Sequence, residues 1–118
     1  DARRMRSILS NDKISPAAHS AIESFHKDVV DEVKTAIGQH KIVVVGMSQN
    51  PVVKKARRIL DEEGLQYHYL EYGSYMAMWK QRLAIKLWSG WPTFPQVFFD
   101  GVLIGGATDL KVYLSSRK

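Results

Sequence analysis

Few side chains in this chain of 118 residues can act as nucleophiles, redox centres or metal ligands. It has no cysteine, so it has no thiolate for disulfide exchange or for iron–sulfur ligation. His19 and His26 lie seven residues apart, and two such ligands alone do not make a zinc site. His40 and His68 show no recognisable partner spacing, and the chain has no serine–histidine–acid pattern and no phosphate-binding glycine loop. We therefore expect no metal and no catalytic residues of these kinds.

A dense group of cations follows the dipeptide Asn50-Pro51. Asparagine favours the position that caps a helix and proline favours the first helical position, so the pair predicts a helix start. The cations spread over more than half of that helix's circumference; they are Lys54, Lys55, Arg57 and Arg58. This surface is either simply solvated or contacts RNA phosphates or an acidic protein. The chain lacks the interleaved exposed aromatic residues of a dedicated single-strand binder, which argues against sequence-specific recognition.

Charge and composition limit the class of protein. The net charge is +5, with 10 basic and 6 acidic residues in the part from 49 to 118. This balance suits acidic partners. The hydrophobic fraction of 45% is typical of one soluble globular domain. No apolar run approaches the roughly 18 residues that span a bilayer, so we expect no membrane span.

The elements that must position these residues follow from hydrophobic periodicity and turn signals. The pattern predicts helices at 16–37, 51–63, 74–88 and 107–115, and strands at 41–45, 66–72, 96–99 and 102–104. Asp100-Gly101 is a two-residue hairpin signal between the last two strands. A strand–helix–strand unit followed by a hairpin gives an α/β fold, with a mixed four-stranded sheet between helices and an extra helix at the N-terminal end.

The beginning of the chain differs from the rest. Residues 1–14 show no period and are expected to form a flexible basic arm, whereas residues 15–118 form the domain. The Arg- and Ser-rich, acid-poor segment 2–10 resembles the tail of an organellar transit peptide, which favours a mitochondrial location.

Two segments resemble the glutaredoxin family, which has a thioredoxin-like fold. The first reads Lys41-Ile-Val-Val-Val-Gly-Met-Ser-Gln-Asn-Pro-Val-Val-Lys-Lys-Ala56 and resembles the family's first strand, active-site loop and helix. The second, from Arg82 to Val97, reads Arg-Leu-Ala-Ile-Lys-Leu-Trp-Ser-Gly-Trp-Pro-Thr-Phe-Pro-Gln-Val. It resembles the monothiol branch, which reads Arg-x-x-Ile-Lys-x-aromatic-Ser-x-Trp-Pro-Thr-Ile-Pro-Gln-Val. Gly105-Gly106 followed by Asp109 resembles the family's glycine-glycine-aspartate motif.

The resemblance implies the remnant of a glutathione pocket. In the family, backbone groups at Thr93 and Phe94 hold the cysteine portion of glutathione. Pro95 corresponds to the family's cis-proline beside the active site. The segment after the double glycine, here Thr108 and Asp109, holds the γ-glutamyl end.

The chain departs from the family at the positions that carry the chemistry. Asn50 and Val53 stand where the family has its Cys-x-x-Cys or Cys-x-x-Ser residues, so the mixed disulfide with glutathione cannot form. Met47 stands where a basic residue usually binds the glycine carboxylate, and Lys86 compensates for this loss in part. We expect no cofactor and at most weak glutathione binding. Without a thiolate, the [2Fe–2S] cluster that monothiol members share between two subunits is also not expected.

These inferences predict a redox-inactive glutaredoxin-like protein that is not an enzyme. Its expected role is that of a structural or interaction subunit in a larger mitochondrial assembly, either the ribosome or a respiratory complex, with protein subunits as partners and RNA as a further partner through the basic helix. The alternative is a glutathione-binding sensor, or an iron–sulfur carrier accessory that a partner's cysteine completes.

Overall fold

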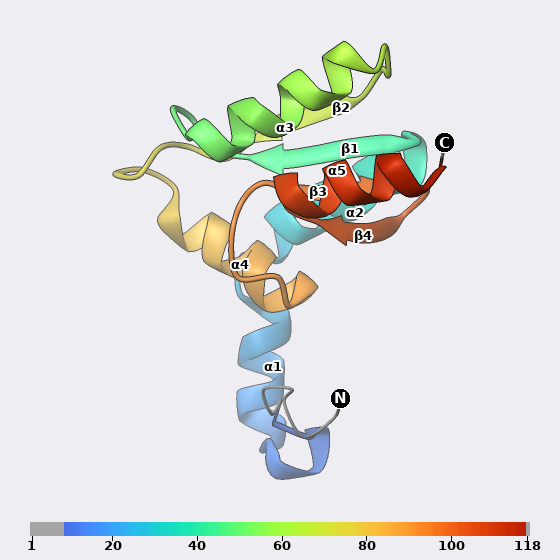
Figure 1. The fold of residues 1–118 in the computed structure, drawn as a ribbon. Coiled ribbons are helices and arrows are strands. Elements are labelled where there is room, and N and C mark those ends of the chain that lie inside the picture. Colours follow the sequence, from blue (N-terminus) through green and yellow to red (C-terminus); the bar gives the residue numbers. More distant parts are fainter. Residues whose placement is uncertain (1–8, 118) are drawn as a thin grey trace.

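The computed structural model describes residues 9–117. Its elements follow the order of the sequence (Figure 1). They are the 3-10 helix η2 (Asn11–Lys13), α1 (Pro16–Ser24), α2 (Lys27–Gln39), β1 (Ile42–Gly46), α3 (Pro51–Glu62), β2 (His68–Glu71), α4 (Trp79–Ser89), β3 (Gln96–Phe99), β4 (Val102–Gly105) and α5 (Ala107–Arg117). Within the described residues, none of the helices combines the length and the apolar character that crossing a membrane requires.

The four strands form one mixed sheet in the order β2-β1-β3-β4. β1 pairs in parallel with β2 and antiparallel with β3, and β3 pairs antiparallel with β4. β1 is buried along its whole length, as its β-branched run predicts for a central strand. Asp100 and Gly101 both have positive φ, 51° and 80°, which is the backbone that a tight two-residue hairpin turn needs.

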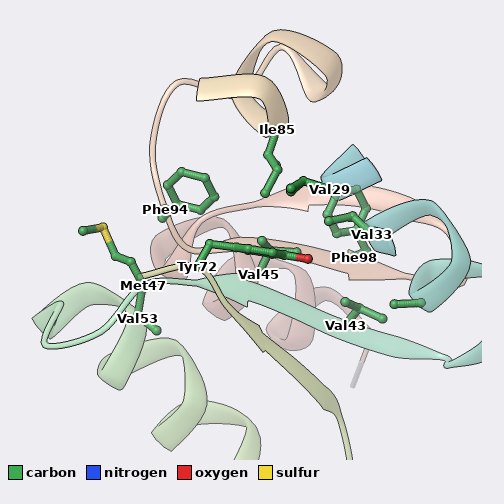
Figure 2. Packing of buried hydrophobic residues seen from close by; sticks show 11 residues of the cluster. Val29, Val33, Val43, Val45, Met47, Val53, Tyr72, Ile85, Phe94 and Phe98 are labelled. Atoms are coloured by element: carbon green, nitrogen blue, oxygen red, sulfur yellow. The ribbon is translucent and has the colours of Figure 1, made fainter. Parts of the chain in front are cut away.

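Helices cover both faces of this sheet. On one face, α2 and α4 pack against each other over side chains that include Val33, Val43 and Ile85 (Figure 2). On the other face, α3 and α5 enclose a second cluster that includes Leu60 and Leu110. The layers are therefore helix, sheet and helix, as expected from the sequence.

The single helix predicted over 16–37 is wrong, because the chain turns at Phe25 and His26. His26 adopts the left-handed region with φ of 46°, and Phe25 ends α1 in an extended conformation. Phe25 is half-buried and lines a groove with Leu87 and Trp88 of α4. The turn therefore lets Phe25 reach α4 while α2 packs on the sheet, and α1, which has no buried residue, extends away from it (Figure 1).

Three other predicted boundaries also differ. Residues 74–78 form a turn, and α4 begins only at Trp79, after Met78 in the left-handed region with φ of 61°. The helix predicted to end at residue 37 continues to Gln39, as α2. In the predicted arm of residues 1–14, η2 occupies Asn11–Lys13, and residues 1–8 lie outside the described part.

Candidate functional site

The start of α3 is built around Asn50, as the sequence predicts. The Asn50 side-chain oxygen accepts hydrogen bonds from the backbone N–H groups of Val52 and Val53, at 2.9 and 3.0 Å. These groups have no carbonyl partner within the helix, so the amide caps it. The Asn50 amide nitrogen also donates to the Tyr75 hydroxyl at 3.3 Å. Val53 is buried and lies in the same cluster as Met47 (Figure 2). Both positions that carry the family's thiols thus have structural roles.

A cleft of about 460 Å³ lies next to this helix start. It brings together five of the residues predicted from the sequence: Met47, Asn50, Lys86, Thr93 and Phe94. Four further residues line it, namely Val52, Tyr75, Arg82 and Pro92. The segments after β1, before α4 and before β3 therefore meet at one place, although they are far apart in the sequence.

Arg82 is the charged residue among the four lining residues that were not predicted from the sequence. Its side chain is buried, and Nη1 donates to the carbonyl oxygens of Tyr72 and Ala77 at 2.9 and 2.6 Å. Lys86 lies one helical turn further along α4, with Nζ 5.6 Å from the centre of the Phe94 ring. The i, i+4 spacing of the two cations is the signal that could have placed Arg82 beside Lys86. Among the residues that the structure describes, no carboxylate lines the cleft, so it suits an anionic group.

Three other predicted pocket residues are not among those that line the cleft. The Phe94–Pro95 peptide bond is cis, as predicted. Pro95 is buried and directly follows Phe94, which lines the cleft. The Asp109 carboxylate accepts a hydrogen bond from the Gly106 N–H at 3.0 Å, which caps the start of α5. Thr108 is exposed in the first turn of the same helix.

The predicted basic surface of α3 divides into two parts. Lys54, Lys55 and Arg58 are exposed. Arg57 instead packs on β2 and its preceding loop: its Nε donates to the Tyr67 hydroxyl at 3.1 Å, and its guanidinium lies 3.9 Å from the centre of the Tyr69 ring. Arg57 is therefore already engaged within the fold, whereas the other three cations face solvent.

The donor set of the cleft fits one of the family's two ligands. A [2Fe–2S] cluster needs thiolates, and the chain contains none, so these residues do not fit it. The Arg82 and Lys86 side chains are suitable for a carboxylate of a peptide such as glutathione, because charge-assisted hydrogen bonds to a carboxylate are strong. Among the described residues, no group of three or more histidine or acidic side chains is arranged to hold a metal ion.

Comparison with known proteins agrees with this geometry. Residues 42–104 match the family model described as Glutaredoxin. A "Glutaredoxin-like protein" of Dictyostelium discoideum is 54% identical over 88 residues, which cover 75% of this chain and 72% of the relative. "Glutaredoxin 1" of Rickettsia felis is 31% identical over 71 residues, covering 60% of this chain and 69% of that protein.

Solved structures show the same fold. A buckwheat glutaredoxin, solved as a complex with glutathione, superimposes with a TM-score of 0.69 at 20% identity, over 81% of this chain and 87% of that one. The architecture is therefore the thioredoxin-like fold of glutaredoxins. The chain belongs to the glutaredoxin family, as a member without cysteine.

Proposed function

We propose that this protein is a redox-inactive member of the glutaredoxin family that acts as a structural or interaction subunit of a larger assembly. It is not an enzyme in this proposal, because the nucleophile on which thiol–disulfide exchange depends is replaced by a helix cap. Its partners are protein subunits, and the exposed cations of α3 offer a further contact to RNA.

The observation that carries the interaction role is an exposed apolar surface on α4 and the turn before it. Six large apolar side chains there are exposed to solvent: Met76, Met78, Trp79, Leu83, Leu87 and Trp88. We call this set the α4 surface. Met76 is 92% exposed and Leu87 is 59% exposed. Contiguous apolar patches on a monomer are typical of protein interfaces, since aromatic residues and methionine are enriched there.

The location of this assembly in mitochondria is part of the same proposal. The transit-like composition of residues 2–10 and the net charge of +5 support it. Fold analogy adds an associational argument, because non-redox proteins of this fold occur as accessory subunits of mitochondrial complexes.

Sedimentation of the native protein from a gentle organelle lysate, with and without RNase, tests this function. We expect migration with a large particle. Release by RNase would identify a ribosome as the assembly, and persistence after RNase would identify a protein-only complex. Migration as a free small protein in both gradients would overturn the proposal.

A glutathione-binding sensor, or a cluster accessory completed by a partner's cysteine, is the second candidate, and the paired cations Arg82 and Lys86 in the cleft favour it. A ligand at 100 times its dissociation constant stabilises the folded state by about 2.7 kcal/mol. Millimolar glutathione should therefore raise the midpoint of thermal unfolding. We expect this increase to be smaller in Lys86→Gln and as large as in the parent in Lys80→Gln, because Lys80 is a lysine of α4 outside the cleft. An unchanged midpoint in the parent protein would exclude this candidate.

A further inference from the structure

A second cavity lies at the opposite end of the parallel strand pair from the cleft. The cleft follows the end of β1, whereas this cavity is formed by residues around the starts of β1 and β2 and by the last residue of α5. Its volume is about 600 Å³. Figure 1 shows the end of α5 beside the start of β1. The lining residues that carry the argument are His40, Lys41, Tyr67, His68 and Arg117.

Two imidazole rings form one wall of this cavity. His40 follows the last residue of α2, two residues before β1 begins, and His68 is the first residue of β2, so the parallel pairing of the strands brings them together. The rings are parallel to within 2°, and their centres are 4.1 Å apart. Each ring can donate an N–H to a bound acceptor.

Lys41 and Arg117 add two permanent positive charges. The Arg117 guanidinium lies 5.5 and 5.6 Å from the ring centres of Phe99 and Tyr113, at the exposed end of α5. Among the residues that the structure describes, no carboxylate lines the cavity. A neighbouring cavity shares His40 and Lys41 and also includes Lys34 and Asp100. The charged side chains that line the histidine cavity itself are therefore all basic.

The Tyr67 side chain completes the polar lining. Its hydroxyl accepts the Arg57 Nε hydrogen bond at 3.1 Å, so the hydroxyl proton is free to point elsewhere. Ile42 and Leu65 supply the apolar part of the wall. A cavity between about 300 and 1,000 Å³ with apolar walls and a few polar groups is the usual size and composition of a small-molecule site.

We propose that this cavity binds a small phosphomonoester. A phosphomonoester carries almost two negative charges near neutral pH and three terminal acceptor oxygens. Donors from two histidines, one lysine and one arginine match such a group better than a carboxylate, which has two oxygens and one charge. The remaining volume accommodates the organic part of the ester. This site does not depend on the proposed role in an assembly, since it uses neither the cleft nor the α4 surface.

The four histidines provide a direct test by proton NMR, because two of them are internal controls. Ribose 5-phosphate is titrated into the full chain, with ribose and succinate as comparison ligands. We expect the imidazole signals of His40 and His68 to shift with ribose 5-phosphate, while those of His19 and His26, which lie on α1 and just before α2, stay in place. The proposal would be overturned if ribose 5-phosphate shifted none of these signals or shifted those of all four histidines equally. It would also be overturned if succinate produced equally strong shifts.

A matched pair of variants on α5 tests the charge requirement. Arg117→Gln removes the cavity cation, and Lys111→Gln removes an exposed cation of the same helix that lies outside the cavity. We expect Arg117→Gln to weaken ribose 5-phosphate binding by about tenfold or more, and Lys111→Gln to change it by less than about twofold. Equal weakening in both variants would show only a general effect of net charge and would contradict the site. Circular dichroism spectra and unfolding midpoints confirm that both variants are folded.

Discussion

At the start of α3, one amide side chain satisfies two backbone N–H groups that no helical carbonyl can reach. A neutral cysteine thiol would be a poorer cap than this amide, because its sulfur is a weak acceptor. Asn50 therefore gives the helix start a capping oxygen and leaves this position without a thiol. Val53 has the corresponding effect one turn later, since a buried apolar side chain packs without a polar group that needs a partner.

Replacing Asn50 with alanine measures the cap. We expect Asn50→Ala to lower the free energy of unfolding by about 1 kcal/mol, because two N–H groups lose their acceptor. Asn50→Ser retains a capping oxygen and should cost about 0.5 kcal/mol or less. Urea denaturation of the three proteins checks this. Equal stability of Asn50→Ala and the parent would show that the amide contributes nothing to helix α3.

Two tyrosines whose hydroxyls donate to carboxylates make the free energy of unfolding depend on pH in the alkaline range. Burial first, and then the hydrogen bond from its hydroxyl to Glu71, together raise the pKa of Tyr69 from 10.0 to about 12. Burial also raises the pKa of Tyr72, whose hydroxyl donates to Glu32. In each case the folded state favours the protonated phenol more than the unfolded state does.

The sign of the pH effect follows from this difference. Below about pH 10 both states keep the phenol proton, and the stabilisation is fully present. As the pH rises from about 10 towards about 12, the unfolded chain releases the Tyr69 proton first, so the free energy of unfolding falls. Urea denaturation over this range should show a shallower fall in Tyr69→Phe than in the parent. Identical slopes in the two proteins would contradict the raised pKa.

At the scale of elements, the sequence predicted the strands and helices that local residue patterns determine. The β-branched run of β1, the Asn50-Pro51 start of α3 and the Asp100-Gly101 hairpin all lie where local chemistry places them. The break between α1 and α2 could not be predicted, because His26 takes a left-handed backbone that is uncommon for any residue other than glycine. The turn brings Phe25 to the groove that Leu87 and Trp88 of α4 also line, and this arrangement depends on residues far apart in the sequence.

The same distinction applies to the cleft. Lys86, Thr93 and Phe94 could be identified because they belong to a contiguous motif. Arg82 lies in that motif too, but its role depends on the carbonyls of Tyr72 and Ala77, which only the folded turn brings near. Tyr75 likewise reaches Asn50 from a segment predicted as helix and found as a turn. Contacts of this kind are not encoded by local spacing.

That turn depends on Gly73, and a pair of glycine variants tests it. Gly73 and Gly64 both have φ of 69°, so alanine at either position costs about 1–2 kcal/mol of backbone strain. A Cβ at Gly73 would also lie 2.4 Å from the Ala77 carbonyl oxygen, whereas nothing lies within 4 Å at Gly64. We therefore expect Gly73→Ala to lower the free energy of unfolding by about 3 kcal/mol or more and Gly64→Ala by about 1–2 kcal/mol. Equal losses in denaturant titrations would show that the turn before α4 relaxes freely.

At the scale of the whole molecule, the structure presents three candidate binding surfaces, of which the cleft and the α4 surface adjoin on α4. The cleft lies at the carboxyl end of β1, the histidine cavity lies at the opposite end of the parallel strands, and the α4 surface is turned to solvent beside the groove that Phe25 lines. Because the α4 surface exposes six large apolar side chains, its contact with water is costly in the isolated protein. Burial against a partner removes that cost, which is why the proposed function assigns this face to the assembly.

The most direct measurement of this central claim compares two tagged variants in a gradient of native organelle lysate. Leu87→Lys places a charge on the α4 surface, and Val112→Lys places the same charge on α5 at a position that is similarly exposed, 65% against 59%. Both side chains lie on helix surfaces, so both variants should fold with nearly the parent's unfolding midpoint. We predict that Leu87→Lys is lost from the large particle and sediments as a free small protein, whereas Val112→Lys remains in the particle. If Leu87→Lys stays in the particle as fully as Val112→Lys, the α4 surface is not the interface and the account is contradicted.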